Sequence, residues 1–367
     1  FIGVALGVNV VIANAVGRKD DKSVKKAVHT AVLFAIIGGF IVAVLGQFIA
    51  EPLLKLLNVP KDVLPYAVLY LRIYLIGMPV ILLYNFEAAI YRSIGETKTP
   101  LIALAASGVL NIVLNLFFVI VLKMTVNGVA IATVVSNAVS SLILFILLLR
   151  TDGNIKISFK ELKIYKDALK NILRIGIPAG IQGAVFAISN IVIQSAINSL
   201  GTVVMAASSA AFNIEVFSYV ILNSFSQTCT TFVGQNYGAG KLDRCKKTML
   251  LCILEGIITL IAVIAVVLSA GKSLIGLFNN DPEVIETGYI RLVLILSAHV
   301  FSLAYEVMSG YLRGCGISAA PAIVSMVGVC GFRIIWVNTV FRHSKTFATI
   351  MTAYPLSLGL TTVAVLI

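Results

Sequence analysis

Eleven long apolar stretches run through this sequence, and most have the length that a helix needs to cross a membrane. A hydrocarbon core about 30 Å thick takes about 20 residues of helix. Because lipid cannot hydrogen-bond to an open backbone, apolar segments of this length are expected to be helical. The stretches are a partial one up to about residue 16, then about 28–50, 66–91, 100–122, 126–149, 172–198, 204–236, 248–270, 287–312, 319–341 and 347–367.

The composition supports this interpretation. Hydrophobic residues make up 59% of the chain and charged residues only 12%. A soluble protein has roughly twice that share of charged residues. The predicted fold class is therefore an all-α polytopic membrane protein.

The two sides of the chain repeat each other at a constant offset of 221 residues. The matching positions are glycines, prolines and arginines, and no gap is needed over the whole distance. A fixed offset of this kind indicates an internal duplication. The pairs are Gly17 and Gly238, Arg92 and Arg313, Gly95 and Gly316, and Pro100 and Pro321.

The repeat predicts two homologous lobes, residues 1–149 and 172–367, joined by a basic linker at 150–171. Five apolar stretches precede the linker and six follow it. The partner of 172–198 is missing, so we expect a parent protein with six helices in each lobe, whose first helix precedes residue 1. Six spans per lobe give both lobes the same orientation, as a parallel repeat with a pseudo-twofold axis along the membrane normal.

Basic residues are concentrated in every second loop. This is the positive-inside pattern, so the net charge of +12 is expected to reflect membrane topology and not nucleic-acid binding. We expect a multi-pass protein of the plasma membrane, the bacterial inner membrane, with the basic loops and the linker in the cytoplasm. The basic segments are 18–26, 150–171 and 241–247, the alternate neutral or mixed segments are 51–62, 199–203 and 272–286, and 342–345 is an exception.

No motif for an enzyme active site, a metal site or a nucleotide site stands out. No phosphate-binding GxxxxGK[ST] loop occurs, and the three histidines are far apart in the sequence. The cysteines form no CxxC pair, which favours a role in apolar packing. We therefore expect no enzyme, no metal and no cofactor. The cysteines are Cys229, Cys245, Cys252, Cys315 and Cys330.

Four glutamates, Glu87, Glu215, Glu255 and Glu306, fall within predicted spans. A carboxylate is costly in a bilayer, so each one needs a reason to be there. Glu215 and Glu306 lie deepest and are the favoured candidates for a coupling ion. They could exchange a proton near neutral pH or supply oxygen ligands to Na⁺. Glu87 and Glu255 are nearer the ends of their spans, which favours a structural role.

Amide side chains add further polar surface inside the spans. The 204–236 stretch is too polar to face lipid along its whole length, so it is expected to line a water-filled cavity or a polar interface. Two other stretches carry amides at i,i+4 spacing, which can hydrogen-bond between helices or coordinate a cation. The residues are Asn213, Asn223 and Gln227 in 204–236, Asn190 and Gln194 in 172–198, and Asn111 and Asn115 in 100–122.

Arg333 lies deep in the 319–341 stretch and needs a carboxylate or the carbonyls of a helix end as its partner. A structural role for it is favoured over substrate binding. Pro79 and Pro178 each remove a helical hydrogen bond and can kink their helices. Such kinks are common in membrane helices, or they could allow bending between transport states.

Several short motifs together resemble the multidrug and toxic compound extrusion (MATE) family, in its bacterial form. The resemblance extends over essentially the whole chain. The motifs are YRSIGETKTP at 91–100, GIP at 176–178, FVGQNYGAG at 232–240, LRGCG at 312–316 followed by Pro321, CGFRIIW at 330–336 and YPLS at 354–357.

The resemblance implies two six-helix lobes around a central cleft and alternating access by a rocking motion. It also implies antiport, in which organic cations, drugs or toxic metabolites leave in exchange for H⁺ or Na⁺. The expected partners are membrane lipid and a small amphiphilic or cationic substrate. We expect a monomer without an obligatory protein partner.

The sequence departs from one branch of this family. That branch has a Glu a few turns after the Gly-x-Pro, but no acidic residue lies between Pro178 and Leu200 here. Its deep Asp is also absent, and Glu306, one turn away, is the candidate replacement. The alternative function is a flippase or exporter of lipid-linked or polar metabolite cargo. Such flippases tend to line the cleft with Arg and Lys, and Arg333 is the only deep basic residue identified, which favours the drug antiporter.

Overall fold

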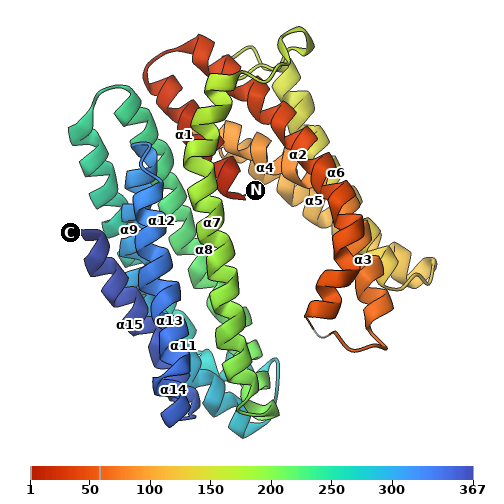
Figure 1. Cartoon of the computed structure of the whole chain (residues 1–367), viewed down its shortest axis with the longest axis vertical. Helices are drawn as coiled ribbons and strands as arrows, with labels where there is room; N and C mark the ends of the chain where they lie inside the picture. The colour runs from red at the N-terminus through yellow and green to blue at the C-terminus, as the bar shows by residue number, and fades with distance from the viewer. Residues whose placement is uncertain (1, 58, 367) are drawn as a thin grey trace. The chain divides into compact units, whose positions relative to one another are not determined.

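A computed structural model describes residues 2–57 and 59–366, and every regular element within these ranges is a helix (Figure 1). The all-α fold class is thereby confirmed. Ile367, the last position of the final predicted span, lies outside the described residues.

The helices of the first half follow the predicted spans in order, and α2 begins seven residues before its predicted span, 28–50, and ends six residues after it. The partial first stretch is the 16-residue helix α1. The elements are α1 (Ile2–Gly17), α2 (Asp21–Leu56), α3 (Leu64–Ile76), α4 (Met78–Ser93), α5 (Lys98–Leu116), which continues through the π-helical turn η1 (Phe117–Val121), and α6 (Val126–Arg150).

The second half begins in the linker, which contains a short 3₁₀ turn, η2 (Phe159–Glu161), before α7. A π-helical turn, η3, interrupts the predicted 319–341 span. The elements are α7 (Lys166–Asn198), α8 (Thr202–Gly238), α9 (Leu242–Ser269), α10 (Gly271–Gly276), α11 (Pro282–Gly314), α12 (Ala319–Ser325), η3 (Met326–Gly331), α13 (Phe332–Asn338), α14 (Val340–His343) and α15 (Phe347–Leu366).

Among the described residues, nine helical segments are long and apolar enough to cross a membrane, and the bent pair α3 and α4 makes a tenth. The bend is 50° and lies at Gly77, within what the sequence predicts as one span. Pro79 is the second residue of α4 and has no N–H to continue the hydrogen bonding of α3, so the expected kink is found here. Pro178, in contrast, lies within an uninterrupted α7.

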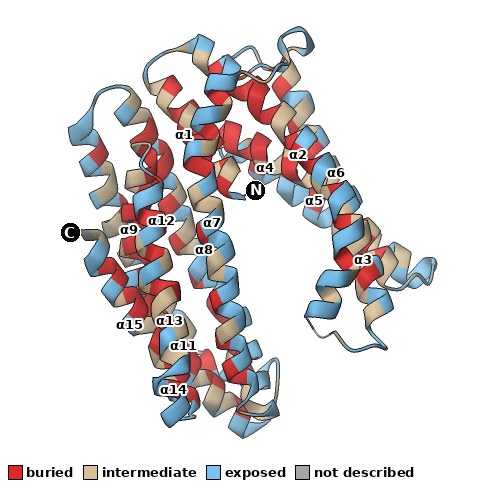
Figure 2. Ribbon diagram, in the orientation of Figure 1, coloured by how far each residue is buried: buried red, intermediate tan, exposed pale blue. Residues whose placement is uncertain are grey.

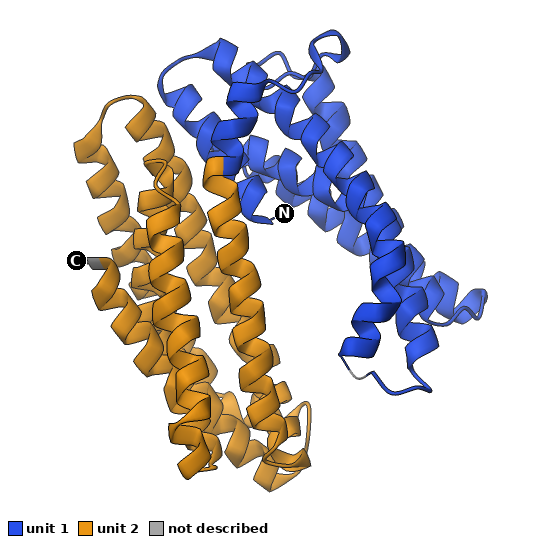
Figure 3. Cartoon of the chain, in the orientation of Figure 1, with its two compact units in different colours: residues 1–173 blue, residues 174–367 orange. Residues whose placement is uncertain are grey.

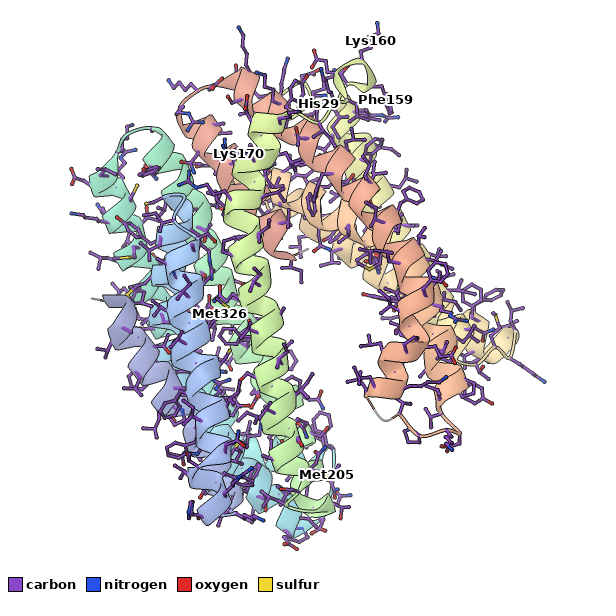
Figure 4. All side chains as sticks on the ribbon, in the orientation of Figure 1. His29, Phe159, Lys160, Lys170, Met205 and Met326 are labelled. Atoms are coloured by element: carbon purple, nitrogen blue, oxygen red, sulfur yellow. The ribbon has the colours of Figure 1, made fainter. Side chains whose placement is uncertain are left out.

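Helix α7 begins at Lys166, six residues before the predicted span. Part of the segment 150–171 is therefore helical, because hydropathy marks where a helix enters lipid and not where its backbone hydrogen bonding starts. The rest of the linker is tied to α2 by side chains that accept backbone N–H groups. Ser158 N–H donates to His29 Nε2 (3.0 Å) and Tyr165 N–H donates to Thr30 Oγ1 (3.1 Å). Figure 4 labels His29 and the neighbouring linker residue Phe159.

The chain divides into two compact units, residues 1–173 and 174–367, which we call unit 1 and unit 2 (Figure 3). In unit 1, α4 packs against α1, α2 and α6 around one large apolar cluster. In unit 2, α11 packs against α8, α9 and α15. Figure 2 shows buried and exposed positions alternating around the helices. Large apolar side chains such as Phe48, Ile102 and Val327 are exposed, as expected for surfaces that face lipid.

The 221-residue repeat is visible in the backbone. Gly95 and Gly316 have φ angles of 85° and 86°, and each donates its N–H to the carbonyl of the arginine three residues earlier, Arg92 or Arg313. This is the Schellman ending of a helix, in which the residue after the cap has a left-handed conformation. Lys19 and Gly240, also 221 apart, repeat the positive φ (57° and 74°). Pro100 and Pro321 are then each the third residue of the next helix.

Replacing Gly316 by alanine should lower the stability of unit 2 by about 1–2 kcal/mol, the cost of a left-handed conformation for a residue with a Cβ. Thermal unfolding in detergent measures this loss. Gly180→Ala is the matched control, because Gly180 lies within α7 with open space around its Cα, and alanine is the better helix former there. Equal unfolding temperatures for the two variants would contradict the expectation.

Candidate functional site

The four glutamates within the predicted spans occupy four different environments. Glu87 is fully buried in unit 1, at 0% exposure, and Glu215 is buried in unit 2. Glu306 is partly accessible, with 19% of its side chain exposed. Glu255 lies on the exposed face of α9, among exposed leucines and isoleucines. Glu215 and Glu306, which the sequence groups together by depth, therefore differ in exposure, and so do Glu87 and Glu255.

Glu215 forms a two-pronged ion pair with Arg291. Arg291 Nε donates to Glu215 Oε2 (3.0 Å) and Arg291 Nη2 donates to Glu215 Oε1 (2.5 Å). The third guanidinium nitrogen, Nη1, donates to Ser208 Oγ (2.6 Å). Only 9% of the Glu215 side chain and 5% of the Arg291 side chain are exposed. The pair joins α8 to α11, and its geometry fits a structural anchor better than a site that exchanges ions.

Glu306 is held by looser contacts. Tyr305 O–H donates to Glu306 Oε1 (2.7 Å), and Arg313 Nη1 lies 3.8 Å from Glu306 Oε2. Arg313 also reaches α7, because its Nη2 donates to Gln182 Oε1 (2.8 Å). The Ser226 Oγ on α8 donates to the backbone carbonyl of Glu306 (2.8 Å). Glu306 is therefore an incompletely paired carboxylate at the contact between α8 and α11.

Amides on α8 lie at the level of Glu306. Gln227 Nε2 donates to Asn223 Oδ1 (2.8 Å), and both residues are partly buried on either side of Ser226. Asn213 is exposed and donates to the carbonyl of Ser209 in its own helix (3.1 Å). Asn223 and Gln227 thus flank Ser226, which bonds the Glu306 carbonyl, whereas Asn213 lies more than two turns earlier on α8.

The two amide pairs with i,i+4 spacing differ. Asn115 Nδ2 donates to Asn111 Oδ1 (3.0 Å), and Asn111 Nδ2 donates to Ser136 Oγ (3.2 Å) on α6. This pair therefore forms the expected bond between helices. On α7, Gln194 instead donates within its own helix to Asn198 (2.8 Å), and Asn190 and Gln194 are both exposed.

Arg333 follows the π-helical turn η3 and is 4% exposed. Its Nε donates to Ser357 Oγ (3.2 Å), and its guanidinium carbon lies 4.0 Å from the ring centroid of Tyr354. The ion pairs found among the described residues include no partner for it. Arg291 and Arg313 are buried as well, so Arg333 is one of three buried arginines among the described residues. Arg291 has no signal of burial in the sequence, because it lies only a few residues into its predicted span.

Cysteines that are scattered in the sequence come together in unit 2. One apolar cluster contains Cys229, Cys245 and Cys252, with Cys315 packed against it. All are free thiols. The described residues contain no group of three or more His, Cys, Asp or Glu side chains suited to a metal ion.

Comparison with known proteins decides the family. The MatE family model matches residues 1–117 and 178–337. The chain belongs to the MatE family. The resemblance seen in the sequence motifs is thereby confirmed, and MatE membership agrees with the multi-pass helical fold.

Two curated relatives are bacterial proteins of drug resistance. The chain is 26% identical over 343 residues to the probable multidrug resistance protein YoeA of Bacillus subtilis (strain 168), an alignment that covers 91% of this chain and 73% of YoeA. It is 23% identical to the multidrug export protein MepA of Staphylococcus saprophyticus, over 88% of this chain and 71% of MepA.

Solved MatE-type structures have the same fold. A MATE structure in complex with MaL6 superimposes with a TM-score of 0.92 at 20% identity, over 99% of this chain and 82% of that one. A transporter of the MOP superfamily from Pyrococcus furiosus Vc1 gives a TM-score of 0.92 at 21% identity, over the same shares of the two chains. The binding pocket of that archaeal transporter has reversed polarity, which suggests a different function for it.

Proposed function

We propose that this MatE protein is a secondary active antiporter that exports organic cations, drugs or toxic metabolites in exchange for H⁺ or Na⁺. Alternating access of its two lobes would carry the substrate. Family membership supports the proposal, as do relatives named for multidrug export. It would need no cofactor other than the coupling ion, and it would act as a monomer in the bacterial inner membrane with its basic loops and linker in the cytoplasm.

The observation that carries the proposal is the state of Glu306. Among the described residues of unit 2, it is the acidic residue that lies inside a helix bundle without a close, two-pronged partner, and part of its side chain is accessible. A proton or Na⁺ arriving there would neutralise its charge and weaken its attraction to Arg313. That change of charge at the α8–α11 contact gives the ion different affinities for different conformations, which is what coupling requires.

Glu306→Gln should abolish the dependence of transport on the driving ion. The protein would be placed in proteoliposomes loaded with a fluorescent organic cation, with a pH gradient or a Na⁺ gradient imposed separately. We expect efflux under one gradient, and a fall of about 5- to 150-fold in the variant, the usual range of coupling between two sites.

Glu255→Gln is the matched control for this experiment, because Glu255 is exposed on α9 and takes no part in the proposed site. It should retain the efflux of the unmodified protein. Efflux in Glu306→Gln that still follows the gradient would exclude Glu306 as the coupling residue. The absence of efflux under both gradients in folded, unmodified protein would argue against drug antiport.

Arg333 favours a second candidate, a flippase or exporter of lipid-linked or polar metabolite cargo. A buried guanidinium without a carboxylate partner can bind a phosphate or carboxylate of the cargo. Under this alternative, Arg333→Gln would reduce transport of a fluorescent lipid phosphate and leave export of an organic cation unchanged. Under the antiporter proposal, the unmodified protein would not move the lipid phosphate at all.

A further inference from the structure

Glu87 is the one buried carboxyl of the described structure that has no cationic partner. It lies on α4 with 0% exposure. Its Oε2 accepts a hydrogen bond from Ser141 Oγ on α6 (3.1 Å), and its Oε1 is buried without any partner. Glu215 has Arg291, and Glu306 has Arg313 and some access to solvent. Glu87 has neither a counter-charge nor access to solvent.

The groups around Glu87 supply no compensating charge. On α4 itself, Tyr84 and Tyr91 lie one turn before and after it, and Arg92 follows. The packed helix α1 has no ionisable side chain. Helices α3, α5 and α6 carry one charged residue each, and each of these lies at the end of its helix or pairs with another residue. These residues are Arg72 on α3, which pairs with Glu51 of α2, Lys98 on α5 and Arg150 on α6.

Helix α2 is equally unable to neutralise Glu87. Its charged residues are gathered in its first two and last two turns. His29, one turn further in, is bonded to the Lys25 carbonyl through Nδ1 (2.7 Å) and accepts the Ser158 N–H at Nε2. Both ring nitrogens of His29 therefore have backbone partners and neither is paired with Glu87. No ion pair among the described residues includes Glu87.

An ionised carboxylate in these surroundings would lose its hydration and gain only one hydroxyl donor. A neutral carboxylic acid loses much less, because it has no net charge to desolvate. The neutral form is therefore the one that this packing accommodates. It can also donate its own O–H to Ser141 Oγ, so that the hydroxyl changes from donor to acceptor.

The internal repeat shows that the fold does not need a carboxyl at this position. The residue 221 positions after Glu87 is Met308, which is buried at the same point of α11 in unit 2. Conversely, the residue 221 positions before Glu306 is Asn85, which is not a carboxyl. An apolar side chain of similar length therefore fills the position in one unit, and a carboxyl fills it in the other. A costly group kept where an apolar one fits is a sign of function.

We infer that Glu87 is a second proton-binding site, located in unit 1, which holds its proton in this packed conformation and releases it when α4 and α6 separate. The reaction is a plain exchange, in which the carboxylate takes one H⁺ from water to become the acid and returns it later. Because only the packed state favours the acid, the bound proton stabilises that state. A part for this proton in transport rests on the proposed antiport, but its binding does not.

Infrared difference spectroscopy of the protein in lipid nanodiscs at neutral pH tests the binding. The C=O stretch of a protonated carboxyl, identified by its shift in D₂O, should disappear in Glu87→Gln and in Glu87→Met. Glu255→Gln should keep it. A spectrum in which Glu87→Gln removes a carboxylate band instead would overturn the inference, whatever the transport assay shows.

Proton release on binding of tetraphenylphosphonium in detergent tests the exchange. A pH indicator should report about one proton fewer per protein for Glu87→Gln and for Glu87→Met. Glu87→Met introduces the residue found at the matching position of the repeat, Met308. This variant should unfold at no lower a temperature than the unmodified protein, which separates proton binding from folding. Unchanged proton release in both variants would show that the proton stays in place, and would overturn the release step.

The infrared measurement also separates a failure of this inference from a failure of the proposed antiport. If Na⁺ and not H⁺ drives export, or if no organic cation is exported, the infrared band of Glu87 should still be present. If Glu306→Gln removes the band while Glu87→Gln leaves it, the neutral carboxyl belongs to Glu306 and the inference is wrong.

Discussion

Glu215→Gln is expected to destabilise unit 2 strongly, and not to uncouple transport selectively. The substitution would leave the guanidinium of Arg291 buried without its counter-charge, 5% exposed between α8 and α11. Breaking a buried pair by removing one partner costs about 3–5 kcal/mol. Thermal unfolding in detergent, or proteolysis during a denaturant series, would measure the loss.

Glu286→Gln provides the matched control for this prediction. Glu286 also pairs with a cation, Lys272, at 2.5 Å, but both side chains are more than half exposed. An exposed ion pair contributes about 0–1 kcal/mol, so the control should unfold almost as the unmodified protein does. Replacing both buried partners, as Glu215→Leu with Arg291→Met, should restore most of the stability, because no lone charge remains. A Glu215→Gln protein as stable as the control would show that the pair is not an anchor.

This prediction reverses the ranking that the sequence suggests for Glu215. Depth within an apolar stretch can be read from the sequence, and Glu87 and Glu215, which are buried in the structure, are among the glutamates that it selects. The partner of a carboxylate cannot be read from the sequence. Arg291, the partner of Glu215, is 76 residues away on another helix. The same holds for Ser141, which lies 54 residues from Glu87. Depth therefore locates these carboxylates, and only tertiary contacts distinguish an anchor from an exchangeable site.

Most of the fold is predictable because lipid imposes few solutions. The lengths of the apolar stretches indicate the spans, and the 221-residue offset indicates the duplication, which returns in the matching φ angles of Gly95 and Gly316. Pro79 indicates the break at Gly77, although not the size of the 50° bend. The start of α7 at Lys166 is not predictable in this way, because polar residues extend a helix beyond the membrane without a hydropathy signal.

The amides show the limit of spacing as a guide. Asn111 with Asn115 and Asn190 with Gln194 have the same i,i+4 pattern, which places each pair on one face of a helix. Only the first pair meets a polar side chain on a neighbouring helix, Ser136, among the bonds of the described residues. Spacing determines which side chains share a face, but the packing of helices decides what that face contacts.

Gly310→Ala is expected to have the second large effect, because α8 and α11 touch through backbone at this residue. A Cβ at Gly310 would lie 2.6 Å from the carbonyl oxygen of Ser226 and 2.9 Å from Thr230 Oγ1. A Cβ at Gly314, four residues later on the same face, would lie as close to the Thr230 carbonyl (2.9 Å). This spacing of small residues lets membrane helices approach closely. A backbone carbonyl cannot rotate away as a side chain can, so the helices themselves would have to separate.

The expected loss for Gly310→Ala is about 1–3 kcal/mol, as for other overpacked sites, and Gly310→Val should lose more. Gly108→Ala, in open space on α5, should lose nothing. Because Ser226 Oγ also bonds the Glu306 carbonyl (2.8 Å), the separation should disturb Glu306 and reduce gradient-driven efflux even in protein that remains folded. Thermal unfolding and the efflux assay on the same preparations would test both effects. If Gly310→Ala matched Gly108→Ala in both, close contact between α8 and α11 would not be what positions Glu306.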